Sequence, residues 1–175
     1  MINLWKFISP HISPSHIHRV NPGSRGTNEP SESSISPLKA EGSSCFALSG
    51  DIKLSDGSLV PRLPGFTRWM WDGEICGEIN FRWNVGTTDL PPHCLGHIGY
   101  EVFSWKRNKG YASEALRQIL PEAIKLGMPF VELTTDVDNL ISQKVIKNNG
   151  GILHEKFVKP AAHGGTDGLR FRIYL

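Results

Sequence analysis

Three basic residues and a glycine stand directly before a predicted helix, in the segment KRNKGYASEAL at residues 106–116. A helix N-terminus carries a partial positive charge and exposes backbone N–H groups without acceptors, so it disfavours cations and binds anions. Arg107 and Lys109 add positive charge, and Gly110 lets the backbone approach a ligand without a Cβ in the way. The segment predicts an anion site, and a solvated basic surface loop is the alternative interpretation.

Two common phosphate-binding motifs do not explain this segment. The sequence contains no G-x-x-x-x-G-K-[ST] motif of the P-loop type. It also contains no G-x-G-x-x-G between a predicted strand and helix, as a dinucleotide-binding domain requires. The anion would therefore be bound by another kind of loop.

Hydrophobic periodicity predicts the elements that position this loop. The alternating segments FTRWMW and EICGEINFRW predict a hairpin with a type I′ turn at Asp72-Gly73, followed by a strand over 97–104. A helix over about 112–124 ends before Gly127, which suits a C′ position. The later predicted elements are a strand over 130–136, a helix over 139–148, and strands over 152–158 and 169–175. The order predicts a mixed α/β fold.

Composition limits the class of protein. A formal net charge of +2 argues against a general nucleic-acid binder, and no apolar run is long enough to span a membrane. The three cysteines (Cys45, Cys76 and Cys94) are far apart and odd in number, as is typical of reduced thiols in the cytoplasm. We therefore expect a cytoplasmic protein without a metal site or a membrane segment.

The chain divides into two regions near residue 50. Residues 1–50 are rich in serine and proline and poor in large apolar residues, so we predict that they are mostly disordered. No acidic residue precedes Glu29, a pattern that resembles an organellar transit peptide, although an ordinary basic tail explains it as well. Residues 51–175 are predicted to form one folded domain.

The basic loop resembles a known motif in its usual setting. The segment from Arg107 to Ala112 is similar to the R/Q-x-x-G-x-G/A pyrophosphate loop of the GNAT superfamily, the acetyl-CoA-dependent N-acetyltransferases. GHIGYEVFSWKRNKGYASEAL resembles the family's fourth strand, coenzyme A loop and following helix, and DNLISQKVIKNNGGIL resembles a later segment. The similarity covers about 66–158 and is close to one branch of bacterial acetyltransferases of unassigned substrate. It implies a central, mostly antiparallel sheet with a splayed fourth strand, and acetyl-CoA as co-substrate.

The resemblance also implies the residues that contact the coenzyme. The end of the fourth strand would pair with the pantetheine arm through its backbone, and the loop and first helical turn would hold the diphosphate. Asn139 and Ser142 would contact the coenzyme from the next helix, whose predicted N-cap is Asp138 or Asn139. The strand-end and loop residues are Val102, Phe103, Ser104, Arg107, Asn108, Lys109, Gly110, Tyr111 and Ala112.

For the reaction, the resemblance implies direct attack of an amine on the thioester in a ternary complex. Strand parity places His97 and Glu101 on one face, so either could take the proton of the amine. An exposed strand carboxylate and a packed histidine are the structural alternatives. The general acid is unassigned, because Ile146 stands where many relatives have tyrosine; Tyr100 or Tyr111 could substitute.

The acceptor side departs from the family. Its members normally have two helices between their first two strands, and residues 1–50 do not resemble them. A partner subunit in a homodimer could supply that wall, or the acceptor site could be open. The acceptor is expected to be a small-molecule or peptide amine. The alternative function is a coenzyme A-binding module with little or no activity that acts through interactions.

Overall fold

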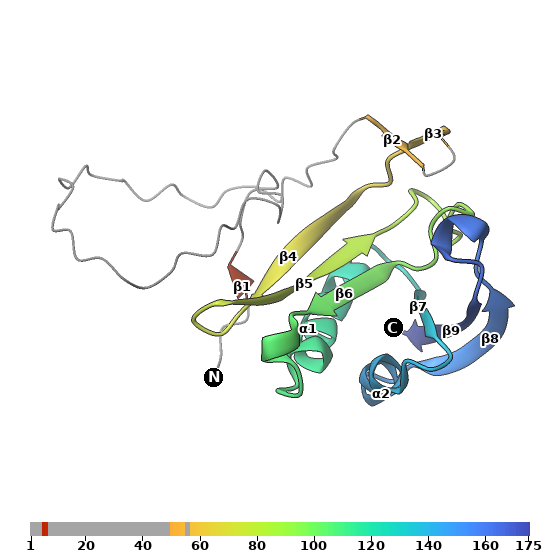
Figure 1. Ribbon diagram of the computed structural model, residues 1–175. Coiled ribbons are helices and arrows are strands. Elements are labelled where there is room, and N and C mark those ends of the chain that lie inside the picture. Colours follow the sequence, from red (N-terminus) through yellow and green to blue (C-terminus); the bar gives the residue numbers. More distant parts are fainter. Residues whose placement is uncertain (1–4, 7–49, 55–56) are drawn as a thin grey trace, which may run out of the picture. The chain divides into compact units, whose positions relative to one another are not determined.

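A computed structural model of the chain describes residues 5–6, 50–54 and 57–175. The predicted disorder of residues 1–50 therefore falls almost entirely outside the described residues. Strands β1 (Trp5–Lys6), β4 (Gly65–Trp71), β5 (Ile75–Arg82) and β6 (Ile98–Val102) form an antiparallel sheet in the order β1-β4-β5-β6 (Figure 1). Strands β2 (Asp51–Lys53) and β3 (Leu59–Pro61) pair with each other, and β7 (Phe130–Asp136), β8 (Ile152–Val158) and β9 (Asp167–Tyr174) form a third sheet, β7-β9-β8. The predicted mixed α/β fold with mostly antiparallel strands is confirmed.

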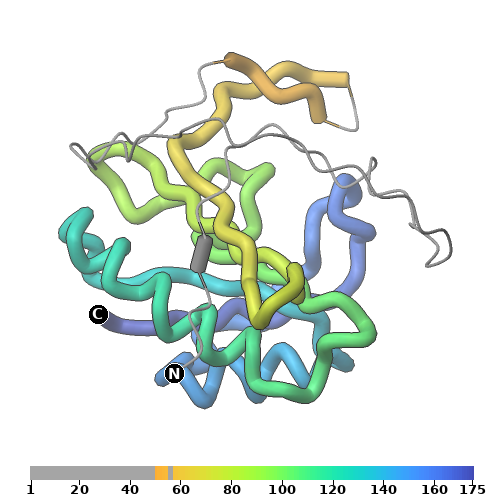
Figure 2. The backbone as a smooth tube through the Cα atoms, turned by 90° about the vertical axis from the view of Figure 1, so that its left-hand side faces the viewer, coloured from red at the N-terminus to blue at the C-terminus, as the bar shows by residue number. Residues whose placement is uncertain are grey.

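Two α-helices pack on these sheets, α1 (Tyr111–Lys125) and α2 (Leu140–Asn148). Figure 2 shows their coils next to each other, and Asn149 Nδ2 at the end of α2 donates to Ser113 O in the first turn of α1 at 3.2 Å. The side of α1 that faces the core consists of residues at helical spacing, whereas Ile124 is 56% exposed. The buried residues are Tyr111, Ala115, Leu116, Ile119 and Ala123. Gly127, at φ 70°, ends the helix as the sequence predicts. The shared core includes Ile79, Phe81, Leu116, Ile119, Leu133, Ile146 and Phe171.

The two larger sheets meet at one histidine. His97 N donates to Glu132 O at 2.8 Å, and Glu132 N donates to His97 Nδ1 at 3.0 Å. A Cβ at Gly96 would lie 2.9 Å from Glu132 O, so this close approach requires glycine. Past this junction β6 and β7 belong to separate sheets. The strand that the resemblance predicts to be splayed is therefore β6.

Two local predictions are wrong. The β4–β5 connection has three residues rather than a two-residue type I′ turn, because a register shift after Met70 pairs Trp71 with Ile75. Only Gly73 in this turn takes a positive φ, of 114°. The strand predicted over 97–104 ends at Val102, and the 3₁₀ turn η2 (Ser104–Lys106) follows it. Both predictions rest on strict alternation of side chains along a strand. Both differences arise where the backbone departs from that regular strand geometry.

Strand β8 is the outer strand of its sheet and is exposed along almost its whole length. Its pairing with β9 shifts register between Leu153 and Glu155, which leaves His154 unpaired in a β-bulge. Ile152 and Val158 are 62% and 68% exposed, so this strand contributes little to the core.

Candidate functional site

The predicted anion loop, Arg107–Gly110, lies between η2 and α1, and all four of its residues are exposed. Asn108 and Gly110 adopt left-handed conformations, with φ of 63° and 79°. A Cβ at Gly110 would meet no atom within 4 Å, so the space beside this glycine is open. No side chain in the described part of the chain caps α1, and the hydrogen bond from Glu114 N to Gly110 O, at 3.0 Å, starts its ladder. The first-turn N–H groups thus have no capping side chain.

The loop also reaches back to the end of β6. Arg107 Nε donates to Val102 O at 3.0 Å. Phe103 N donates to Cys76 O at 2.9 Å, and Phe103 O accepts from Lys106 N at 2.8 Å. Of the residues predicted to pair with pantetheine, Phe103 has both backbone groups engaged. Among the described residues, the side-chain donor to the Val102 carbonyl is Arg107, which is exposed and can turn away.

A carboxylate missed by the sequence analysis lies next to the loop. Asp72 Oδ1 accepts from Lys106 Nζ at 2.8 Å, and Asp72 Oδ2 accepts from the hydroxyl of Tyr111. The hydrogen bond from Lys106, followed by those from Tyr111 and Cys76, holds the pKa of Asp72 far below its usual value. The Tyr111 side chain is buried here, so only its backbone is available to a ligand of the loop. Because Asp72 and Lys106 are 34 residues apart, no local sequence pattern connects them.

The predicted contacts on α2 lie across from β6. Asn139 Oδ1 accepts from Ser142 N at 3.0 Å, so Asn139 rather than Asp138 is the N-cap of α2. The hydroxyls of Ser142 and Tyr100 lie 2.9 Å apart, and Tyr100 thereby joins β6 to the first turn of α2. Burial raises the pKa of the Tyr100 hydroxyl. Asn139 and Ser142 are thus connected with the splayed strand.

The two candidate bases have very different surroundings. Glu101 is exposed and pairs in register with Glu78 of β5, so two carboxylate residues stand opposite each other. His97 has no exposed surface, and its Nδ1 accepts from the backbone of Glu132. Burial lowers the pKa of the His97 imidazole, which keeps it neutral. An external amine can reach Glu101 and cannot reach His97.

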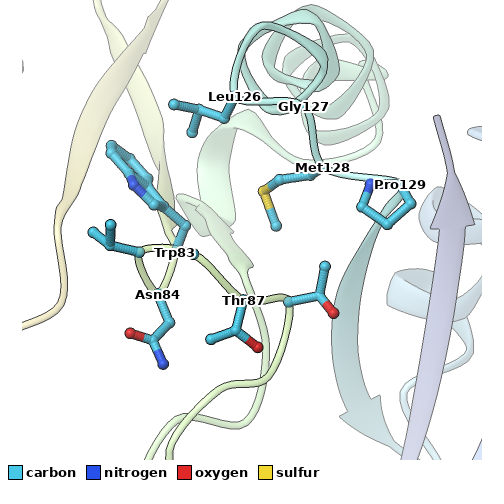
Figure 3. Close-up of a pocket in the computed structure, with 10 residues that line it drawn as sticks. Trp83, Asn84, Thr87, Leu126, Gly127, Met128 and Pro129 are labelled. Atoms are coloured by element: carbon cyan, nitrogen blue, oxygen red, sulfur yellow. The ribbon is translucent and has the colours of Figure 1, made fainter.

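A pocket of about 570 Å³ lies at the other end of α1 (Figure 3). Its walls come from Trp83–Thr88, after β5, and from Leu126–Pro129, after α1. The 15 residues of α1 separate it from the Arg107–Gly110 loop by about 22 Å of helix. It therefore contains none of the predicted site residues.

Residues 60–152 match the family described as "Acetyltransferase (GNAT) domain". The chain belongs to the GNAT acetyltransferase family. The matched region of this GNAT domain runs from β3 to the start of β8 and contains every residue predicted for the coenzyme and for catalysis. A comparison with curated proteins gave no match.

Solved acetyltransferase structures show the same fold. A crystal structure of a probable acetyltransferase has 21% identity and a TM-score of 0.51, covering 63% of this chain and 62% of that one. The acetyltransferase MccE, in complex with acetyl-CoA and AMP, has 17% identity and a TM-score of 0.50, covering 63% and 61%. RimL, a ribosomal L7/L12 α-N-protein acetyltransferase in complex with coenzyme A, has 16% identity and a TM-score of 0.51, covering 63% and 62%. The chain thus spans less than two thirds of the length of these proteins.

Among the described residues of this GNAT domain, no three His, Cys, Asp or Glu side chains gather as a metal site would require. None of the helices in residues 50–54 and 57–175 is both long and apolar enough to cross a membrane.

Proposed function

We propose that this protein transfers the acetyl group of acetyl-CoA to an amine, with both substrates bound together. The main support is the exposed loop Arg107–Gly110, which leads into a helix N-terminus without a capping side chain inside the matched GNAT segment. The MccE and RimL structures, which contain acetyl-CoA and coenzyme A, support the choice of anion. The residues present fit a diphosphate, because the space beside Gly110 is open, the N–H groups of the first turn of α1 follow it in the chain, and the exposed cations Arg107 and Lys109 precede it.

The coenzyme would lie along β6 and the loop. Backbone N–H groups from Asn108 to Ala112 would bind the diphosphate, with Arg107 and Lys109 supplying charge. The pantetheine arm would pair with Val102 and Ser104, after Arg107 releases the Val102 carbonyl that it holds at 3.0 Å. Asn139 and Ser142 would approach the arm from α2.

In the proposed reaction, the amine nitrogen attacks the thioester carbonyl, a C–N bond forms, the C–S bond breaks, and the sulfur leaves as a thiolate that takes up a proton. An alkylammonium has a pKa near 10.4, so freeing it at pH 7 costs roughly 4.6 kcal/mol. Glu101 would accept this proton, directly or through water, because it is the exposed candidate on β6. Positioning of the two substrates would supply most of the remaining acceleration.

The acceptor is proposed to be a cationic small-molecule or peptide amine. Glu78 and Glu101 stand opposite each other on β5 and β6, and like charges in this arrangement repel. An ammonium group beside them would relieve that repulsion. The same ammonium would then lie next to its base.

Tyr100 is the tyrosine better placed to protonate the departing thiolate. The Tyr111 hydroxyl donates to Asp72, whereas the Tyr100 hydroxyl lies between β6 and α2, beside Ser142. Its raised pKa keeps it protonated at neutral pH, as an acid must be. Tyr100→Phe is therefore expected to lower kcat with little change in the KM for acetyl-CoA.

A melting experiment tests coenzyme binding first. Acetyl-CoA at 100 times its dissociation constant would stabilise the fold by about 2.7 kcal/mol. An unchanged melting curve in millimolar acetyl-CoA would contradict the proposal. Release of free thiol with a panel of amines then tests transfer, and Glu101→Gln is expected to lower kcat about 100-fold or more without weakening coenzyme binding. Unchanged turnover would exclude Glu101 as the base. The comparison variant is His97→Gln, which changes the candidate base that an external amine cannot reach.

The alternative, a coenzyme A-binding module with little or no activity, is favoured by one observation. Ile146, where many relatives have tyrosine, is fully buried in the core of this chain and offers no hydroxyl. Coenzyme binding without thiol release for any amine would support this alternative. The cytoplasmic location and the homodimer stay predictions.

A further inference from the structure

We propose that Asp72 is a positioning residue that holds both ends of the coenzyme loop at a fixed separation. This inference rests on the proposed function, because it concerns the loop that would bind the diphosphate. Asp72 lies in the turn between β4 and β5, far from the loop in sequence. Its two carboxylate oxygens bind Lys106, which precedes the loop, and Tyr111, which follows it.

The loop itself has few means of holding its own shape. Its four residues are exposed, and two of them, Asn108 and Gly110, require left-handed backbone conformations. Glycine adopts this conformation without a steric cost, and asparagine adopts it more readily than most residues with a Cβ, so these two residues allow the bend but do not fix it. An exposed four-residue segment with this geometry needs to be fixed from its ends, and the residues at both ends are bound to Asp72.

The side chains that join the two ends of the loop to Asp72 are shielded from solvent, which strengthens their hydrogen bonds. The Lys106 and Asp72 side chains are 11% and 13% exposed, and Tyr111 is buried. Lys106 Nζ also lies 3.0 Å from Glu74 Oε2, but the Glu74 side chain is 75% exposed, so solvent screens this second pair. Charge-assisted hydrogen bonds to a shielded carboxylate are the strong kind. Asp72 is therefore the principal anchor and Glu74 a minor one.

Asp72 also controls where the Lys106 charge goes. Its carboxylate holds the ammonium of Lys106 in the turn, which leaves Arg107 and Lys109 as the exposed cations of the loop. Without Asp72, Lys106 would keep only the exposed Glu74 carboxylate as a described partner, and its charge would be held less firmly and would repel Arg107 and Lys109 more strongly. The loop would lose both its span and its charge arrangement.

The test compares two acetyl donors with the full-length protein. Acetyl-CoA carries the diphosphate, and S-acetylpantetheine lacks it. Asp72→Asn is expected to raise the Kd and KM for acetyl-CoA about tenfold, the usual effect of losing one charge-assisted hydrogen bond. The kcat with saturating acetyl-CoA and the kcat/KM with S-acetylpantetheine should stay unchanged, because neither depends on the diphosphate. Asp89→Asn, the same change of charge in the exposed β5–β6 loop, should leave all of these values unchanged.

A second pair of variants covers the case in which Asp72→Asn fails to fold. Lys106→Arg keeps a donor for Asp72 and should retain the wild-type Kd, whereas Lys106→Gln should weaken acetyl-CoA binding as Asp72→Asn does. The inference is overturned if Asp72→Asn or Lys106→Gln binds acetyl-CoA as tightly as wild type, or if either loses activity equally with both donors. A wild-type protein that binds no acetyl-CoA would overturn the proposed function as well, so the two failures are distinguishable.

Discussion

The two α-helices of the described chain begin in opposite ways. At α2, the side chain of Asn139 accepts from Ser142 N at 3.0 Å and satisfies one of the free N–H groups. At α1, the corresponding position is Gly110, whose φ of 79° is left-handed and which has no side chain to offer. Two exposed cations, Arg107 and Lys109, precede it. One helix is thus capped by its own sequence, and the other is left open next to positive charge.

Because of this difference, the start of α2 serves the stability of the fold, whereas the start of α1 suits the binding of an anion. An Asn N-cap contributes about 1 kcal/mol relative to alanine, and a cation near a helix N-terminus costs about 0.3–1 kcal/mol. The start of α2 is therefore favourable on its own, whereas the start of α1, which has the Glu114 carboxylate in its first turn, lacks a capping side chain and follows two cations. A bound diphosphate would supply to α1 what Asn139 supplies to α2.

The largest expected effect comes from filling the open space beside Gly110, at the start of α1. Gly110→Val should abolish the stabilisation of about 2.7 kcal/mol that acetyl-CoA at 100 times its Kd gives the wild type, because the added side chain occupies the diphosphate position. Thermal denaturation with and without acetyl-CoA measures this. Gly127→Val is the matched control: Gly127 has φ 70°, also with no atom within 4 Å of a Cβ, and lies at the other end of α1.

The control should lose stability from backbone strain, by roughly 1–2 kcal/mol, and still respond fully to acetyl-CoA. If Gly110→Val retained the wild-type response to acetyl-CoA, the open end of α1 would not be the diphosphate site.

Removing the cap of α2 should have the next largest effect. Asn139→Ala is expected to lower the free energy of unfolding by about 1 kcal/mol, because Ser142 N loses its acceptor. Asn139→Ser keeps a capping oxygen and should cost only a few tenths of a kcal/mol by the same principle. Chemical denaturation of both variants without ligand makes the measurement. Equal destabilisation by serine and alanine would argue against the capping role.

Removing a cation from the loop before α1 should change the free energy of unfolding and the affinity for acetyl-CoA in opposite directions. Lys109→Gln is expected to raise the free energy of unfolding of the free protein by about 0.3–1 kcal/mol at low salt, since a charge that opposes the helix dipole is lost. The same variant should bind acetyl-CoA more weakly in calorimetry. Lys156→Gln, on the exposed strand β8, should change neither quantity. A simultaneous loss of stability and affinity would contradict this interpretation of α1.

The smallest effect concerns the carboxylate in the first turn of α1. Hydrogen bonds from Arg117 and Gln118 lower the pKa of Glu114 from 4.5 to about 2. A pKa lowered by folding stabilises the protein above about pH 4.5, and this contribution is lost as the pH falls towards 2. The Glu114 side chain is 36% exposed, so solvent limits the gain to about 0.5 kcal/mol. The stability difference between wild type and Glu114→Gln should therefore shrink between pH 5 and pH 2.5, as measured by urea denaturation; a constant difference would contradict it.

Sequence reasoning succeeded where the signal is local and periodic. The predicted strands 130–136 and 152–158 match β7 and β8. Gly127 follows the end of α1, and Asn139 caps the start of α2, as expected. Sequence reasoning failed where the residues in contact are far apart in the sequence. The Asp72–Lys106 pair depends on how β5 and β6 align, and the burial of His97 depends on where the two sheets meet. Strand parity placed His97 and Glu101 on one face but could not distinguish a residue inside the sheet junction from one at the surface.

The bulge in β8 has a consequence for the protein in concentrated solution. An outer strand with free backbone groups and apolar side chains is a template for another strand, and Ile152 and Val158 are exposed there. The bulge at His154 interrupts the regular spacing of those backbone groups, and the neighbouring charges of Glu155 and Lys156 disfavour an apolar partner strand. This edge is therefore built against fibril-like stacking, and straightening it by deleting His154 would be expected to promote aggregation.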